Sequence, residues 1–193
     1  GSDPVPLPPR YRDLPSVEVR PRLEGKYSEY VPEEAVSEIR SHDLDFILRF
    51  SFGILRGEVL EAARYGIWSF HHDDERKYRG GPPAFWEVYH GNAETGFILQ
   101  RLTEELDGGV VLARDSVPTV STSYEENLSR TLLASRKLPV RVCRRILETG
   151  EPDGAASPTD APIYSYPTNR RFLVFCAKIL ARRVKRALST ALR

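Results

Sequence analysis

The sequence predicts an α/β fold with a mainly parallel sheet, helices on both faces of that sheet, and a basic amphipathic helix at the C-terminus. Short apolar runs of strand length alternate along the 193 residues with segments of helical spacing, which is typical of strand–helix–strand units. After Asp160 no acidic residue occurs, whereas Arg and Lys are frequent. These patterns divide the chain into an extended Pro-rich lead-in at 1–15, an α/β domain at 16–150, a linker at 151–168 and the basic helix at 169–193.

The first half of the chain contains three predicted strands and three predicted helices. A glycine closes the apolar run LDFILRFSFG, which predicts a buried strand, and Pro32 with two following glutamates suits the first turn of a helix. Proline opens and glycine closes the segment PPAFWEVYHG, as in many helices. In order, we predict a strand at 16–20, a helix at 31–42, a strand at 44–53, a helix at 56–66, a strand at 66–71 and a helix at 82–91.

The second half predicts two strands and two helices. The strands alternate between apolar and polar side chains. The first helix has Thr122 or Ser123 as its N-cap, and Pro139 should kink it. A connector rich in Pro, Gly and Ser separates the two helices. The predicted ranges are strands at 95–103 and 110–118, a helix at 122–148, the connector at 150–168 and a helix at 169–192.

Composition excludes several classes of protein. The net charge is +1, so no overall field marks a nucleic-acid binder. Cys143 and Cys176 are too few and too far apart for a disulfide framework, which indicates reduced thiols in a cytoplasmic protein. No apolar run approaches the roughly 18–20 residues of a membrane span, and no signal peptide is visible. Because the chain contains no Met, we expect it to be a piece of a longer protein.

Residues 66–83, GIWSFHHDDERKYRGGPP, concentrate the polar chemistry of the chain. A metal site is disfavoured, because His71 and His72 are neighbours on a predicted strand and point to opposite faces. A phosphate site is open, since the Arg-Gly-Gly turn at 79–81 precedes a helix whose N-terminus offers backbone N–H groups. That turn matches neither a Walker loop nor a dinucleotide fingerprint. An acyl-transfer centre is the third interpretation.

The order of the motifs favours acyl transfer. The run from GIWSFHH to LDGGVVL resembles the folate-dependent formyltransferases, which include methionyl-tRNA, glycinamide ribonucleotide and sugar N-formyltransferases. Their Asn-x-His strand, Gly-Gly turn and Asp-x-Gly loop correspond here to Ser69-Phe70-His71, KYRGGPP and LDGGVVL, with ETG at 94–96 between the last two. The resemblance covers residues 44–118. It implies a partial Rossmann-like formyltransferase domain.

The resemblance implies Ser69, His71 and Asp107 as the catalytic constellation, with His72 as a loop or packing residue that points the other way. The family transfers a formyl group from N10-formyltetrahydrofolate to a neutral amine, and no metal is expected. A histidine can move the proton, a nearby aspartate orients it, and a polar side chain donates to the oxyanion. Ser69 replaces the family's asparagine, and its shorter side chain needs a water or a closer approach to reach the same oxyanion.

Binding residues also follow from the resemblance. Arg79 suits a phosphate-bearing acceptor such as a nucleotide sugar, although a solvated surface arginine fits the pattern equally well. The implied cofactor-binding residues are Phe52, Gly53, Ile54, Leu55, Glu104 and Glu105, and the implied substrate-binding residues are Arg79, Gly80 and Gly81. For 52–55, ordinary core packing is the alternative.

The acceptor is the most open part of the prediction. No set of short strands after residue 150 could build the tRNA-holding barrel of methionyl-tRNA formyltransferase, so an amino sugar, glycan precursor or glycolipid is favoured over tRNA. Because of Ser69, a catalytically silent binding or scaffold domain is the alternative function. Residues 1–43 lack the family's glycine-bearing first strand and turn, which predicts an N-terminally truncated sheet. An exposed sheet edge would favour a homodimer.

The C-terminal segment predicts a helix with one apolar stripe, and Arg and Lys occupy much of its remaining surface. The stripe contains Leu173, Ala177, Leu180, Val184, Leu188 and Ala191. Such a helix can lie on the anionic inner face of a membrane, as a peripheral contact through 169–193. The alternatives are a helix packed on its own domain and a lead into a further C-terminal module.

Overall fold

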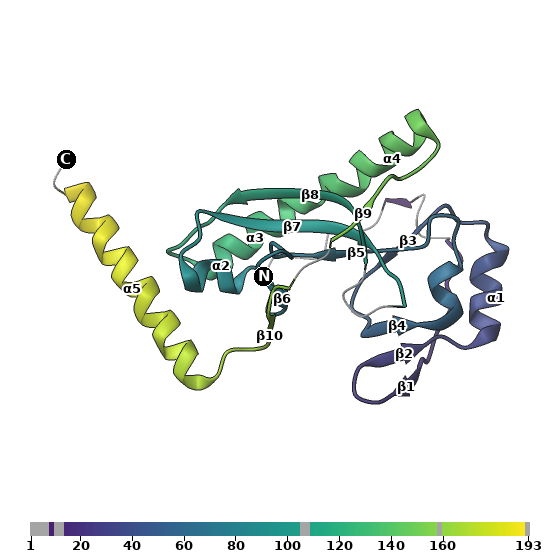
Figure 1. The fold of residues 1–193 in the computed structure, drawn as a ribbon, viewed down its shortest axis with the longest axis horizontal. Helices are drawn as coiled ribbons and strands as arrows, with labels where there is room; N and C mark the ends of the chain where they lie inside the picture. Colours follow the sequence, from purple (N-terminus) through teal and green to yellow (C-terminus); the bar gives the residue numbers. More distant parts are fainter. Residues whose placement is uncertain (1–7, 10–13, 105–108, 158–159, 192–193) are drawn as a thin grey trace.

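A central five-stranded sheet with the strand order β3-β5-β7-β8-β9 organises the fold (Figure 1). The computed structural model describes residues 8–9, 14–104, 109–157 and 160–191. The strands of this sheet are β3 (Ile47–Arg49), β5 (Ile67–His71), β7 (Glu94–Arg101), β8 (Val110–Pro118) and β9 (Ala155–Ala156). The α/β class predicted from the alternation of strands and helices is therefore confirmed.

The central sheet is mixed in direction, which differs from the expectation of a mainly parallel sheet. Strands β3 and β5 pair in parallel, whereas β5–β7, β7–β8 and β8–β9 are antiparallel pairs. The connection from β7 to β8 is shorter than the roughly dozen residues of a parallel crossover, so these strands form a hairpin. Further parallel pairs join β2 (Ser28–Tyr30) to β4 (Ile54–Arg56) and β6 (Arg79–Gly80) to β10 (Ile163–Tyr164).

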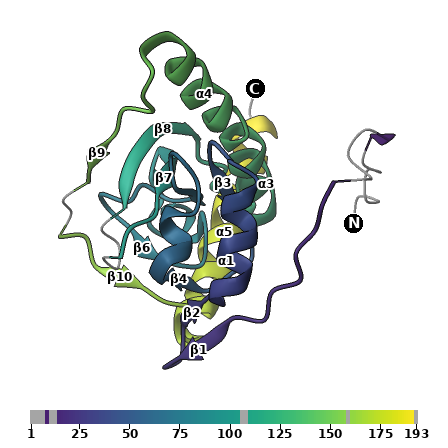
Figure 2. The same ribbon diagram turned by 90° about the vertical axis from the view of Figure 1, so that its right-hand side faces the viewer.

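One face of the central sheet is covered by α3 (Tyr124–Ser135) and α4 (Lys137–Thr149), which Figure 2 shows beside β7 and β8. The buried residues of this core include Trp68, Phe97, Leu99, Leu112, Leu138 and Val142. Burying a Leu, Val or Phe side chain in this way stabilises the fold by about 1.5–3 kcal/mol. The apolar side chains of α4 therefore determine which face the helix covers, and they leave the opposite face of β5 for polar groups.

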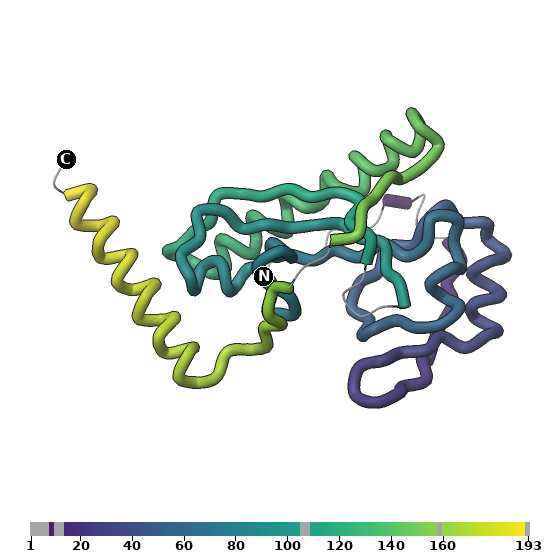
Figure 3. The backbone as a smooth tube through the Cα atoms, viewed as in Figure 1, coloured from purple at the N-terminus to yellow at the C-terminus, as the bar shows by residue number. Residues whose placement is uncertain are grey.

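A smaller three-stranded sheet with the order β1-β2-β4 lies beside the central sheet, as the backbone trace in Figure 3 also shows. It includes the hairpin of β1 (Arg22–Glu24) with β2 and is accompanied by α1 (Glu33–Ser41) and the 3₁₀ helix η2 (Gly57–Glu61). Its core consists of Val36, Leu55, Val59, Leu60, Ala62 and Ile67. Because Ile67 is also the first residue of β5, this core fixes the small sheet to the strand that carries the candidate site.

The C-terminal helix α5 (Asn169–Ala191) packs on α2 (Phe85–His90) through Phe175, whose ring centroid lies 4.3 Å from that of Phe85. Basic residues of α5 donate to carbonyl groups of the domain: Lys178 Nζ to Tyr89 O at 2.9 Å and Arg182 Nη1 to Val88 O at 2.6 Å. The leucines and valine of the predicted stripe, Leu173, Leu180, Val184 and Leu188, are exposed. The helix thus docks on its own domain by its basic side and leaves the apolar stripe outward.

Most predicted elements are confirmed with boundary shifts of a few residues, but four are not. No strand forms at 16–20, and the first strand of the described chain is β1. The predicted helix at 56–66 is the short 3₁₀ helix η2. The predicted buried strand at 44–53 reduces to β3, and Phe50 and Phe52 beyond it are 62% and 41% exposed. Apolar composition alone did not show that this run leaves the sheet after three residues.

The predicted long helix at 122–148 is two helices, divided at Arg136. The N-cap is Ser123, whose side chain accepts from the backbone N–H of Glu126 at 3.3 Å. Pro139 lies in the first turn of α4, where a backbone N–H has no intrahelical partner to lose. In one continuous helix, the proline ring would clash with the Ser135 carbonyl, so the helix ends and restarts ahead of it.

Candidate active site

Strand β5 carries the predicted catalytic positions Ser69 and His71 on one face of the sheet, because alternate residues of a strand share a face. In the register, Ser69 lies between Arg49 of β3 and Gln100 of β7, and His71 lies opposite Ile98. Ser69 is 2% exposed, and the side chain of His71 is 19% exposed. The sheet therefore forms a largely enclosed row of polar side chains at the carboxyl end of β5.

Arg49, the last residue of β3, is a charged donor to Ser69. Arg49 Nη1 donates to Ser69 Oγ at 3.0 Å, and Nη2 donates to the carbonyl oxygens of Phe52 and, at 2.6 Å, Gly53. Burial lowers the pKa of Arg49 and the Glu29 carboxylate opposes this, but a guanidinium stays charged in a protein. Arg49 was not predicted as a site residue, although an arginine inside the otherwise apolar stretch FILRF is a visible signal.

His71 contacts the loop that follows β5. Its Nε2 lies 3.1 Å from the carbonyl oxygen of Tyr78 and 3.9 Å from Asp73 Oδ2. A carbonyl oxygen accepts only, so His71 Nε2 carries a proton in this contact. The Nδ1 atom of the neutral ring is then the nitrogen that can take up a proton.

His72, the first residue after β5, packs against the helices on the side of the sheet that carries Phe70. Its ring stacks on Phe70 with centroids 5.5 Å apart, and Nε2 lies 3.0 Å from the hydroxyl of Ser135 in α3. Burial, and then the charge of His71, lowers the pKa of His72 to about 4. His72 is therefore neutral at physiological pH, and it occupies the core side that the alternation of strand residues predicted.

The predicted residues Asp107 and Glu105 lie outside the described residues. Glu104, which precedes them, accepts from the backbone N–H of Gly57 at 2.7 Å, and its Oε2 lies 3.7 Å from Arg56 Nη1. This contact joins the segment after β7 to the end of β4. The two segments from which the cofactor-binding residues were predicted therefore lie side by side.

Only some of the backbone groups in the predicted cofactor segment 52–55 make hydrogen bonds within the protein. The N–H of Gly53 donates to Glu29 Oε2 at 2.9 Å. In the parallel register, Ile54 and Arg56 bond to β2, so the backbone N–H and C=O of Leu55 point to the opposite edge of β4. No strand of the described chain covers that edge.

The predicted substrate-binding turn Arg79-Gly80-Gly81 is held by β10. The N–H of Arg79 donates to Pro162 O at 3.4 Å, and that of Gly81 donates to Tyr164 O at 3.1 Å. Gly80 has φ +84°, and a Cβ there would collide with the Tyr164 carbonyl, so glycine is required. Two N–H groups of the predicted phosphate site therefore donate to carbonyl groups of the protein and do not face a phosphate.

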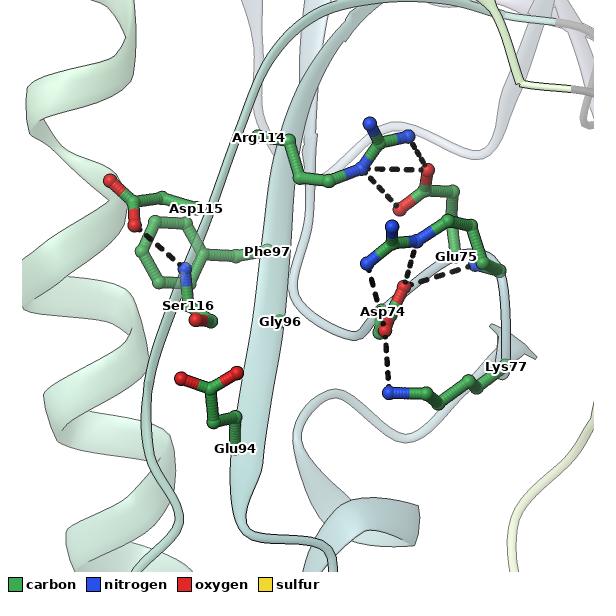
Figure 4. A pocket seen from close by; sticks show the side chains of 10 residues that line it. Asp74, Glu75, Lys77, Glu94, Gly96, Phe97, Arg114, Asp115 and Ser116 are labelled. Atoms are coloured by element: carbon green, nitrogen blue, oxygen red, sulfur yellow. Dashed lines mark hydrogen bonds and ion pairs between the residues drawn. The ribbon is translucent and has the colours of Figure 1, made fainter.

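A charged cavity of about 270 Å³ lies where the loop after β5 crosses β7 and β8 (Figure 4). Gly96 permits this crossing, because a Cβ there would come within 2.8 Å of the Asp74 Cα. Asp74 pairs with Arg76 at 2.8 Å, and Glu75 pairs with Arg114 of β8. These ion pairs fasten the loop that Nε2 of the site histidine contacts.

Two classes of feature are absent from the parts of the chain that the structure describes. No group of three or more His, Cys, Asp or Glu side chains there could hold a metal ion. No helix in those parts is long and apolar enough to cross a membrane.

Comparison of the sequence with known proteins gives a consistent result. A family model described as formyl transferase matches residues 12–140. A methionyl-tRNA formyltransferase of Prochlorococcus marinus is 31% identical over 62% of this chain and 37% of its own length. That of Ralstonia nicotianae is 29% identical over 75% of this chain and 44% of its own length. The chain thus spans less than half the length of these relatives.

Comparison of the structure gives the same fold. A protein from Mycobacterium tuberculosis, described as uncharacterised and a "likely sugar N-formyltransferase", superposes with a TM-score of 0.55 and 18% identity. The match covers 80% of this chain and 71% of the other. At this identity, the likeness establishes the fold alone.

Proposed function

Because the chain belongs to the formyl transferase family, we propose that it carries the reaction centre of a folate-dependent N-formyltransferase. The proposed donor is N10-formyltetrahydrofolate, and the proposed acceptor is an amine on a sugar or glycan precursor. One observation carries the proposal. Arg49, Ser69 and His71 place a cation, a hydroxyl and an imidazole next to one another on two paired strands.

The hydrogen bond from Arg49 explains how a serine can stand where the family has asparagine. Ser69 Oγ accepts from Arg49, so its own O–H remains available as a donor. The carbonyl of Phe70 lies 3.4 Å from that oxygen, which is a long contact that a developing oxyanion can replace. A guanidinium that bonds to the hydroxyl oxygen polarises the O–H and strengthens it as a donor.

The proton chemistry falls to His71. Its Nε2 contacts the Tyr78 carbonyl, and the imidazole is proposed to take up the proton of the attacking amine. Asp107 is proposed to orient the ring, as the resemblance implies. When bound, N10-formyltetrahydrofolate supplies the activated formyl carbon. The chain itself supplies the donor, the base and the enclosure of both by the sheet.

The residues present fit a folate at the edge of β4. A pterin ring has donors and acceptors along one edge, and the backbone N–H and C=O of Leu55 offer a matching pair. The carboxylate of Glu104 lies at the end of β4, where it accepts from the N–H of Gly57, and the ring of Phe52 is exposed. We propose Phe52, Gly53, Ile54, Leu55, Glu104 and Glu105 as the residues that would hold the cofactor.

A groove beside the turn at 79–81 supports a phosphate-bearing acceptor. Its volume is about 700 Å³, and its lining combines the rings of Tyr78, His90 and Tyr164 with the cations of Arg76 and Lys77. Aromatic faces can stack on a base or a sugar, and the cations can meet a diphosphate. A nucleotide-linked amino sugar has both parts. We therefore propose it over tRNA, with Arg79, Gly80 and Gly81 at the acceptor side.

Helix α5 supports a peripheral contact with an anionic membrane surface. Its exposed stripe, from Leu173 to Leu188, faces away from the domain, and Arg170 and Lys185 add positive charge to the helix. A membrane surface would bring the domain close to a lipid-linked acceptor.

The test is calorimetric titration of the chain with 5-formyltetrahydrofolate, followed by a transfer assay with nucleotide-linked amino sugars. We expect binding, and transfer that His71→Ala abolishes without loss of binding. Binding without transfer to any amino sugar, but with transfer to aminoacylated tRNA, would support the methionyl-tRNA alternative. If the chain binds no folate at any concentration tested, the silent scaffold replaces the proposed enzyme.

A further inference from the structure

Two acidic side chains are buried directly behind His71, where the loop after β5 meets α2. Asp73 is 2% exposed and Glu87 is 0% exposed. Aspartate and glutamate are almost never buried this completely without a cationic partner. Within the described residues, no arginine or lysine pairs with either carboxyl, and the one ion-pair contact is the 3.9 Å approach of Asp73 Oδ2 to His71 Nε2.

Backbone groups hold both carboxyls in place. The N–H of Ala84 donates to Asp73 Oδ1 at 2.9 Å, and the N–H of Asp74 donates to Glu87 Oε1 at 3.1 Å. These contacts hold both carboxyls at the start of α2, where the loop meets the helix. Two carboxylates buried together without a cation repel each other, so one of them takes up a proton.

The second oxygen of Glu87 identifies which member carries the proton. Glu87 Oε2 is buried and meets no N–H or O–H donor in the described part of the chain. A buried acceptor normally has a partner, and the neighbouring carboxyl of Asp73 becomes a donor when it is protonated. Since Asp73 Oδ1 already accepts from Ala84, the proton resides on Oδ2. The arrangement is an Asp73 O–H that donates to a Glu87 carboxylate.

The electrostatic environment agrees with this assignment. Burial, and then the charge of Glu87, raises the pKa of Asp73, and burial raises the pKa of Glu87 as well. Asp74 faces the pair from the loop, and its charge raises the pKa of Glu87 further. Tyr78 from the loop and Tyr124 from α3 also face the pair, and the pKa of each is raised by burial and then in part by nearby carboxylate charge.

We propose that Asp73 and Glu87 are positioning residues for His71: a neutral Asp73 faces the imidazole, and the single negative charge of the pair stays on Glu87. His71 then has no ionised carboxylate from this pair beside its Nε2, so the pair does not favour the imidazolium over the neutral imidazole. The neutral imidazole is the form that can accept a proton from an amine. The catalytic meaning of this arrangement rests on the proposed function, but the protonation states do not.

The test follows the titration midpoint of the His71 imidazole by NMR in the folded chain, without folate or acceptor. Asn at position 73 mimics a protonated aspartate, so Asp73→Asn should leave the midpoint unchanged. Glu87→Gln removes the second cause of the raised pKa of Asp73 and leaves the first, which is burial. The midpoint should therefore stay the same, or rise if Asp73 ionises, but it should not fall in either variant.

A fall in the midpoint would overturn the proposal. If Asp73 is already ionised in the native chain, Asp73→Asn lowers the midpoint by about one unit. Glu94→Gln serves as the control for removal of an exposed carboxylate. Infrared spectroscopy of the native chain provides a second test that needs no variant. A protonated carboxyl band should persist at neutral pH, and its absence would also overturn the proposal.

Discussion

Arg49 Nη1 donates a 3.0 Å hydrogen bond to Ser69 Oγ across the parallel pair of β3 and β5. This contact joins the residue that departs from the formyltransferase pattern to a residue that the pattern does not include. The site therefore stays polar although Ser69 replaces the asparagine of the family pattern. A charged donor on the neighbouring strand accompanies the shorter side chain.

Removing the hydroxyl of Ser69 should destabilise the fold. In Ser69→Ala, Arg49 Nη1 loses its acceptor inside the sheet, and a buried donor without a partner costs about 1–3 kcal/mol. Urea unfolding measures the loss of unfolding free energy. Ser189→Ala on the exposed end of α5 is the matched control and should change stability little. Equal stability of the two variants would mean that the Arg49–Ser69 bond does not form in solution.

Substitution of the two adjacent histidines should affect the rate of formyl transfer differently. His71→Ala removes the group on the polar face of β5 and should abolish formyl transfer to an amino-sugar acceptor. His72→Ala removes a ring from the helix side, so it should lower stability and leave transfer in the folded fraction nearly unchanged. The measurement is the rate of tetrahydrofolate release per folded molecule. A greater loss of rate in His72→Ala would reverse the two roles.

Stability should fall on acidification because of His72. Its pKa is lowered from 6.5 to about 4 by burial and then by the charge of His71, so the unfolded chain binds a proton that the folded chain does not. Stability is therefore full above pH 6.5 and is lost as the pH falls toward 4, with a slope of at most ~1.4 kcal/mol per pH unit.

Thermal unfolding across this pH range tests the assignment. His72→Asn should flatten the slope, whereas His42→Asn, at an exposed position, should leave it unchanged. A slope that persists in His72→Asn would assign the proton uptake to another group.

The apolar stripe of α5 should determine membrane contact. Leu180 is 63% exposed, and Leu180→Glu should abolish co-sedimentation of the chain with vesicles that contain anionic lipid. Leu147 is 86% exposed at the end of α4, so Leu147→Glu is a control that adds the same charge elsewhere. Wild-type binding should weaken as salt rises. If the wild-type chain does not bind at low salt, the stripe serves another purpose.

The sequence by itself determined the class of fold and the family, and it predicted which strand carries the candidate site. These follow from local physics: the period of apolar side chains marks helices and strands, and alternation along β5 separates His71 from His72. The order of short motifs identified the family without any contact information. The sequence also predicted a kink at Pro139 in one long helix, whereas the structure has two helices divided at Arg136.

Only the tertiary structure decided what surrounds Ser69 and His71. Arg49 meets Ser69 because β3 and β5 pair in one register, and Asp73 meets Glu87 because a loop folds back on α2. Strand direction also depended on pairing. A strand shows the same apolar period whether the strand beside it is parallel or antiparallel. Side chains far apart in the sequence acquire their charge states and partners from burial, and burial is a property of the whole packed chain.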